Sequence, residues 1–83
     1  MKKQTEGYYI STDLALVAAL SLQFPIEHID KTNPRKVRFS LKDSDALQTL
    51  VQSYWRKELR IEPRSYYDQL RTLKSLLYSE ENL

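Results

Sequence analysis

Hydrophobic and polar residues alternate most regularly between positions 36 and 41. Residues two apart lie on the same face of an extended strand, so one face of this segment would be apolar and the other polar and basic. A second segment, 26–30, precedes it, and the loop 31–35 between them contains an Asn-Pro pair, which is typical of a turn. The pattern therefore predicts a β-hairpin. The residues expected on its buried face are Val37, Phe39 and Leu41.

A first helix is predicted over residues 14–22. This segment is rich in leucine and alanine, and its apolar residues lie nearly all round a helix, which is typical of a helix buried on most sides. Ser11 is expected to cap its N-terminus, and Asp13 would lie in the first turn, where the helix dipole favours a carboxylate. The helix is expected to end before Pro25, because proline disfavours helical backbone at the residue before it.

Two further helices are predicted in the second half of the chain. After Ser44, a good N-cap residue, apolar residues recur at spacings of three and four as far as about Lys57. Pro63 is well placed as the first residue of a last helix that extends to about Ser79, with an apolar stripe along one side. Both helices are therefore expected to pack on a core through one face.

The remaining elements are two short extended segments. Residues 8–10 favour a strand, and residues 59–62 alternate over too few positions for a helix, so we predict an extended connector or a fourth strand there. The resulting order is β-α-β-β-α-β-α, a small single α+β domain over residues 1–83 in which a hairpin and short strands pack against two or three helices. Residues 1–6 and 80–83 are expected to be flexible or frayed. One common core is expected to contain Leu16, Val37, Phe39, Leu47, Leu50, Tyr54 and Leu70.

The composition indicates an ordered, soluble domain. The chain has no cysteine, so disulfides and thiolate metal sites are excluded, and a cytoplasmic location is expected. The apolar run 14–22 is not followed by the small-residue cleavage site of an export signal, and it is far shorter than the roughly 20 apolar residues that cross a bilayer. We therefore expect no membrane association.

Few side chains in the sequence are suited to catalysis. Nucleophilic catalysis needs a base beside a serine or a cysteine, and His28 is the only imidazole. Asp30 would share a strand face with it, which is the minimal beginning of a metal or acid–base site, while the alternative places His28 on a solvent-exposed strand face. Asp43 and Asp45 flank Ser44 and are assigned to the start of a helix. We therefore expect no enzyme activity, no catalytic residue, no bound metal and no cofactor.

Basic residues are concentrated in the middle of the chain. Residues 31–74 contain eleven Lys and Arg against five Asp and Glu, a net charge of +6, although the whole chain carries +2. A basic β-ribbon can follow a phosphate backbone, and arginines with aromatic rings can bind single-stranded nucleic acid. We therefore predict one basic surface that binds DNA or RNA. Its residues are Lys31, Arg35, Lys36 and Arg38, the hairpin group, and Arg56, Lys57, Arg60 and Arg64, the second basic group.

Alternatives to this hypothesis stay open. The charges could simply solubilise the surface and protect an edge strand, and Trp55 could be a core residue. The six tyrosines and the tryptophan, with Leu76 and Tyr78 outside the main apolar stripe of the last helix, favour a protein-interaction module or a homodimer. Nucleic-acid binding should weaken steeply with salt, whereas an apolar interface should hardly respond.

Three stretches of the chain resemble a known family. They are ISTDLAL at residues 10–16, IDKTNPRKVRF at residues 29–39 and YWRKELRIEP at residues 54–63. In this order they resemble a small uncharacterised bacterial family with a domain of unknown function, and the likeness covers residues 8–78. The resemblance implies a stand-alone domain and assigns no activity to any residue.

Overall fold

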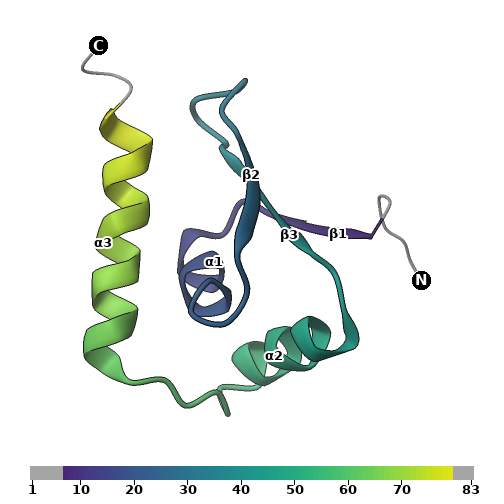
Figure 1. Cartoon of the computed structure of the whole chain (residues 1–83). Helices are drawn as coiled ribbons and strands as arrows, with labels where there is room; N and C mark the ends of the chain where they lie inside the picture. The colour runs from purple at the N-terminus through teal and green to yellow at the C-terminus, as the bar shows by residue number, and fades with distance from the viewer. Residues whose placement is uncertain (1–6, 80–83) are drawn as a thin grey trace.

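Three strands and three helices make up the structure, a computed structural model that describes residues 7–79. The strands form one antiparallel sheet in the order β1-β3-β2, and Figure 1 shows α1 between this sheet and the other two helices. The predicted α+β class is confirmed. The elements are β1 (Tyr8–Ser11), α1 (Leu14–Leu20), β2 (Ile26–Asp30), β3 (Arg38–Lys42), α2 (Asp45–Trp55) and α3 (Pro63–Ser79).

The sheet is built around its central strand. Both β1 and β2 pair antiparallel with β3, so β1 and β2 run parallel to each other with β3 between them. Since α1 connects β1 to β2, the first four elements form a split β-α-β unit closed by a hairpin. Among the described residues, no further strand pairs with the outer edge of β1 or of β2.

The predicted hairpin is confirmed, with its second arm shifted along the chain. Phe39 and Leu41 are buried, at 1% and 0% exposure, while Arg38 and Lys42 are exposed, as the alternation predicts. The strand spans Arg38–Lys42 instead of 36–41, because the turn extends further than predicted. The carbonyl oxygen of Asn33 accepts a hydrogen bond from the Lys36 amide at 2.9 Å.

The first helix is buried as predicted, but both of its ends differ. All residues from Leu16 to Leu20 are at most 2% exposed. The N-cap is Asp13, whose Oδ1 accepts from the Leu16 amide at 3.2 Å, whereas the predicted cap, Ser11, accepts from the Asp13 amide. The helix ends at Leu20 instead of position 22, because the chain tightens into a turn at its C-cap, Ser21.

The helix α2 begins at its predicted cap and ends two residues earlier than predicted. The hydroxyl of Ser44 accepts a hydrogen bond from the Leu47 amide at 3.1 Å. The last helical residue is Trp55 instead of Lys57, since Lys57 has a left-handed φ of 64°, which an α-helix cannot continue.

No strand forms at residues 59–62, which corrects the predicted order to β-α-β-β-α-α. The alternation itself is present, since Leu59 and Ile61 are half-buried and the residues after each are exposed. A strand also needs a partner for its backbone hydrogen bonds, and no described strand lies beside this segment. It is therefore an extended connector between α2 and α3, and Pro63 is the first residue of α3 as predicted.

The core consists of two clusters instead of one, because α1 is apolar all round and separates them. Predicted core residues Leu16, Leu47, Leu50 and Tyr54 belong to the first cluster, and Val37, Phe39 and Leu70 to the second. The fully buried members are Leu16, Leu20, Leu41, Leu47 and Val51 in the first and Val17, Ala18, Phe39 and Leu73 in the second.

Two expectations concern the ends of the chain and the membrane. The predicted flexible segments, 1–6 and 80–83, lie outside the described residues. Within residues 7–79, no helix has the length and apolar character that crossing a membrane requires.

Candidate nucleic-acid interface

The face of the sheet that points away from α1, here called the outer face, is covered by none of the described helices. Phe39 and Leu41 of β3 point inward and pack against the helices. The alternate residues of β3 therefore point outward, and so do the residues of β1 and β2 that pair with them. The register places seven residues on this face. They are Tyr8 and Ile10 from β1, Arg38, Ser40 and Lys42 from β3, and His28 and Asp30 from β2.

An irregularity in β2 directs His28 to the outer face. Ile26 pairs with the buried Leu41, and His28 pairs with Ser40, so two steps along β2 match one step along β3. Glu27 is the extra residue of this β-bulge. Residues two apart normally share a face, and the bulge instead places Ile26 inward and His28 outward. The interpretation of His28 as a residue on an exposed strand face is confirmed.

Two aromatic rings meet on the outer face. The rings of Tyr8 and His28 lie edge to face, with centroids 6.1 Å apart and an angle of 80° between their planes. They come from the two strands that flank β3, so they approach each other across the central strand. Ile10, which is 46% exposed, lies in the same cross-strand row as His28, with Ser40 between them. The middle of the outer face therefore offers ring and apolar surface to solvent.

Cations lie at both ends of this ring pair along β3. Arg38 is exposed at one end and Lys42 at the other, each separated by one residue from Ser40, which lies between them on the same face. Arg35 and Lys36 are exposed in the adjoining turn. Three members of the hairpin group are thus at the surface near the outer face, and Lys42 adds a fourth cation.

The fourth member of the hairpin group, Lys31, is directed to α3 instead. Its Nζ donates a hydrogen bond to the Leu76 carbonyl oxygen at 2.6 Å. Asp30 lies opposite Arg38 in the register. Hydrogen bonds from Thr32 lower the pKa of the Asp30 carboxyl, and the charge of Arg38 lowers it further. Asp30 is therefore a stable negative charge that offsets part of the charge of Arg38.

The second basic group lies at the opposite end of the molecule. In Figure 1 the tip of the β2–β3 hairpin is at the top, and the connector between α2 and α3 is at the bottom. The prediction that both groups form one basic surface is therefore wrong. Trp55, beside the second group, is 59% exposed and not a core residue.

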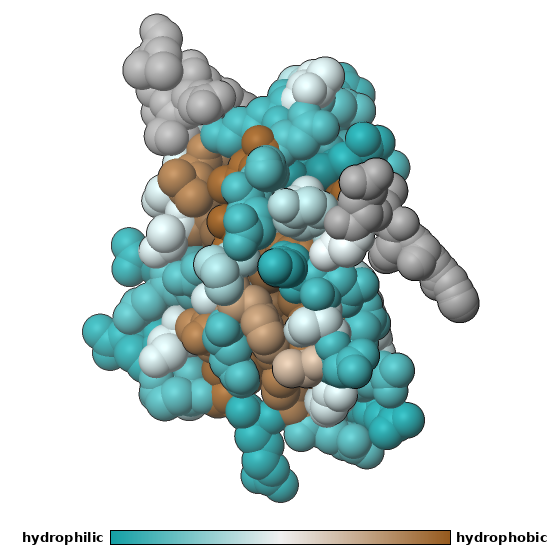
Figure 2. Space-filling model, turned by 45° about the vertical axis from the view of Figure 1, so that its right-hand side comes forward, coloured by the Kyte–Doolittle hydropathy of each residue, from teal (hydrophilic) through white to brown (hydrophobic). Residues whose placement is uncertain are grey.

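Apolar side chains also reach the surface elsewhere. Figure 2 shows brown apolar residues in the middle of a mostly hydrophilic face. Exposed groups of this kind, bordered by polar residues, are typical of surfaces that bind partners. The large hydrophobic residues most exposed among those described are Ile10, Trp55, Tyr67, Leu76 and Tyr78.

Sequence reasoning missed Tyr8, Ile10 and Lys42 as site residues. The alternation in β1 showed that one of the two adjacent tyrosines faces outward, but not which one. Lys42 continues the period of Arg38 and Ser40, and that spacing could have identified it. No cluster of three or more metal-ligating side chains occurs within residues 7–79.

Comparison with known families gives a match over most of the chain. A family model described as "Domain of unknown function (DUF5659)" matches residues 6–79. No curated protein and no solved structure matches the chain significantly.

Proposed function

The chain belongs to the DUF5659 family of domains of unknown function, and we propose that it binds single-stranded nucleic acid through the outer face of its sheet. The observation that supports this proposal is the ring pair on this face, the half-buried Tyr8 and the exposed His28, between cations. The family match assigns no ligand, so the proposal depends on the chemistry of this face alone.

The shape of the face favours single strands over duplexes. Bases in a duplex are stacked on each other, and their faces are inaccessible to protein side chains. Unpaired bases can lie flat on aromatic rings, and a β-sheet with exposed rings is a common surface for such contacts. The rings of Tyr8 and His28 would stack with bases, and the hydroxyl of Ser40, which lies opposite His28 in the register, is suited to hydrogen bonding.

The cations around the rings would contact the phosphates. Arg35, Lys36 and Lys42 are exposed, and Arg38 contributes less because Asp30 lies opposite it. With about three to four phosphates contacted, log affinity for a single strand should fall with log salt at a slope of roughly −2 to −3. A cytoplasmic location, where such strands occur, is part of this proposal.

Fluorescence anisotropy with labelled oligonucleotides tests the proposal. We expect the full chain to bind single-stranded DNA or RNA at low salt, to bind the matching duplex more weakly, and to show the salt slope given above. Undetectable binding at low salt would contradict the proposal, and so would a preference for duplex.

The ring pair provides the first variants. Base–aromatic stacking contributes about 1–3 kcal/mol per base, so Tyr8→Ala and His28→Ala should each weaken binding by roughly 5- to 150-fold. Tyr67→Ala is the matched control, because Tyr67 is an exposed ring, 56% accessible, on α3 away from the sheet. Circular dichroism confirms that each variant is folded. If Tyr67→Ala weakens binding as much, the outer face is not the site.

Charge reversal provides the second pair. The double variant Arg35→Glu, Lys36→Glu should abolish measurable binding of the oligonucleotide. The double variant Arg71→Glu, Lys74→Glu on α3 changes the net charge equally and should keep most of the binding affinity. All four residues are exposed. Equal losses in the two double variants would show that only the overall charge matters, and the proposed site would be wrong.

A further inference from the structure

An open apolar pocket lies where α2 passes into α3. Its volume is about 360 Å³, which is within the range of about 300–1,000 Å³ that is usual for ligand pockets. Two of its residues, Leu59 and Ile61, also line a second pocket of about 290 Å³. The larger pocket is lined by Tyr54, Lys57, Leu59, Ile61, Pro63 and Tyr66.

The walls of this pocket are held by contacts elsewhere in the fold. The hydroxyl of Tyr66 donates a hydrogen bond to the Ala15 carbonyl oxygen at 3.2 Å, which ties α3 to α1. Burial raises the pKa of Tyr54, and the charge of Asp13 raises it further, so its phenol stays protonated. The pocket is therefore preformed, and its lining is largely apolar apart from one cation, Lys57.

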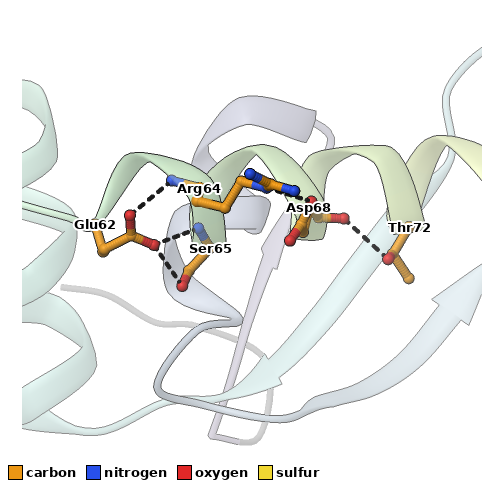
Figure 3. Close-up of polar contacts among 5 residues, drawn as sticks. All are labelled: Glu62, Arg64, Ser65, Asp68 and Thr72. Carbon is orange, nitrogen blue, oxygen red and sulfur yellow. Dashed lines mark hydrogen bonds and ion pairs between the residues drawn. The ribbon is translucent and has the colours of Figure 1, made fainter.

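The start of α3 is fixed by Glu62. One of its carboxylate oxygens accepts a hydrogen bond from the Arg64 amide at 3.1 Å, and the other accepts from the Ser65 amide at 2.7 Å, as Figure 3 shows. These are backbone donors that the first turn of a helix leaves without an intrahelical partner. The cap fixes the position of Pro63, which forms one side of the pocket.

Cations and an exposed tryptophan lie in the chain segment that forms the pocket. All four residues of the second basic group are exposed, and they lie in the same segment as the pocket residues. The Nε of Arg64 lies 3.8 Å from Oδ1 of Asp68, so Arg56, Lys57 and Arg60 are the cations left for a partner, with one exposed carboxylate, Glu58, among them. The carboxylate of Glu62 is used by the cap, so it offsets this charge while offering few free acceptor sites. Trp55 is 59% exposed, and its ring lies 5.0 Å from that of Tyr54. Tryptophan, tyrosine and arginine around an apolar pocket are typical of binding hot spots.

The backbone at Lys57 supports the same site. The Glu58 amide donates to the Ser53 carbonyl at 2.9 Å, and the Lys57 amide donates to the Tyr54 carbonyl at 3.1 Å, which together form a Schellman motif. Its left-handed position usually holds glycine, and a residue with a side chain costs about 1 kcal/mol or more there. The strained residue is the one cation that lines the pocket. Strain of this kind is concentrated at binding sites.

We propose that the α2–α3 junction binds an acidic protein segment whose large apolar side chain enters this pocket. The volume suits one such side chain, and the nearby cations Arg56, Lys57 and Arg60 would complement carboxylates next to it. Two of the six lining residues are tyrosines, so binding of a nucleic-acid base at this site is an outcome that the experiments below must distinguish. A two-fold contact centred on this junction would bring the cations of a second copy close to these, so a different, acidic protein is the partner proposed.

The tryptophan is a natural reporter for the first experiment, because Trp55 is the only one in the chain. The probe is a capped pentapeptide with phenylalanine between two pairs of aspartates, titrated against the full chain. We expect a saturable change in tryptophan fluorescence and NMR shift changes at Leu59 and Ile61. Replacing the phenylalanine by alanine should weaken binding at least about tenfold, and replacing the aspartates by lysines should abolish it.

Two matched pairs of variants locate the site, with a fluorescein-labelled peptide as the readout. Trp55→Ala should weaken binding about tenfold, whereas Tyr78→Ala should not, although both rings are 59% exposed. Arg60→Glu should weaken it and Lys74→Glu should not, since both are exposed cations but only Arg60 adjoins the pocket residues. The variants on the outer face should bind the peptide normally, so this proposal and the nucleic-acid proposal fail independently.

Several results would overturn the proposal. They are the absence of saturable binding, equal binding of the alanine peptide, equal losses in the control variants, and NMR shift changes on the outer face instead of the junction. Displacement of the peptide by a single-stranded oligonucleotide with shift changes at the junction would assign the site to nucleic acid. If the mass in solution rises with protein concentration and Trp55→Ala removes this rise, the junction is a homodimer interface.

Discussion

The outer face of the sheet and the α2–α3 junction are similar in sequence and different in structure. Each combines about four cations with aromatic residues and lies next to an alternating segment. At the outer face, backbone pairing with β3 holds every side chain in register. At the junction, a connector without strand partners lies beside an apolar pocket.

This difference separates the two proposals. A flat face with rings between cations suits a stacked, negatively charged strand. A pocket surrounded by cations suits one apolar side chain with carboxylates near it. Residue composition did not distinguish the two regions, because it does not show whether an aromatic ring is part of a flat surface or of a cavity wall.

Shortening one apolar side chain in each region should give the largest difference in the free energy of unfolding. Phe39 is buried beneath the outer face, so Phe39→Ala should lower the free energy of unfolding by about 3–5 kcal/mol. Leu59, at the junction, is half-buried, and Leu59→Ala should cost about 1–2 kcal/mol. Urea unfolding measures both. Similar values would show that the junction is as tightly packed as the sheet.

The left-handed backbone of Lys57 predicts a smaller effect of the opposite sign. Lys57→Gly should raise the free energy of unfolding by about 0.5–1 kcal/mol, because glycine adopts this conformation without strain. Arg56→Gly is the control: its φ of −81° is right-handed, so that glycine should lower stability by about the same amount. If Lys57→Gly is destabilising, Lys57 makes contacts that outweigh the strain. A more stable variant that binds the acidic peptide less well would link the strain to the site.

The smallest expected effect concerns acid sensitivity at the junction. Hydrogen bonds from the Ser65 and Arg64 amides lower the pKa of the Glu62 carboxyl from its usual value of 4.5. Its contribution to stability is therefore complete above that value and is lost as the pH falls through the lower, folded-state pKa. Glu62→Gln should reduce the fall in melting temperature over this range. Ser65→Ala keeps both amide donors, so this variant should keep most of the fall in melting temperature. If Ser65→Ala reduces that fall as much as Glu62→Gln does, the lowered pKa of Glu62 is due to the Ser65 hydroxyl.

Most of the fold could be predicted from the sequence, and the errors have physical causes. The alternation around Phe39, the cap at Ser44 and the helix start at Pro63 are local patterns, and the structure confirms them. Residues 59–62 have the alternation of a strand, but whether a neighbouring strand is available depends on the whole topology. The division of the core by α1 follows from three-dimensional packing, which periodicity along the chain does not determine.

The site was less predictable. The hairpin cations followed from their spacing, but the orientation of His28 depends on a bulge at Glu27, and no residue type there indicates a bulge. Lys31 could not be separated from Arg35 and Lys36, because its hydrogen bond to α3 joins residues 45 positions apart. The opposite placement of the two basic groups likewise depends on the tertiary fold.

The split β-α-β arrangement also has a consequence for how the molecule folds. The hairpin of β2 and β3 can form locally, whereas Tyr8 must find its partner Lys42 across all of α1 and β2. Long-range pairings of this kind pay a loop-closure entropy and form late. We therefore expect β1 to dock last during folding and to detach first during partial unfolding. Because the ring pair takes one ring from β1 and the other from β2, it would exist only in fully folded molecules, and a nascent or partly unfolded chain would present the cations without the stacking surface.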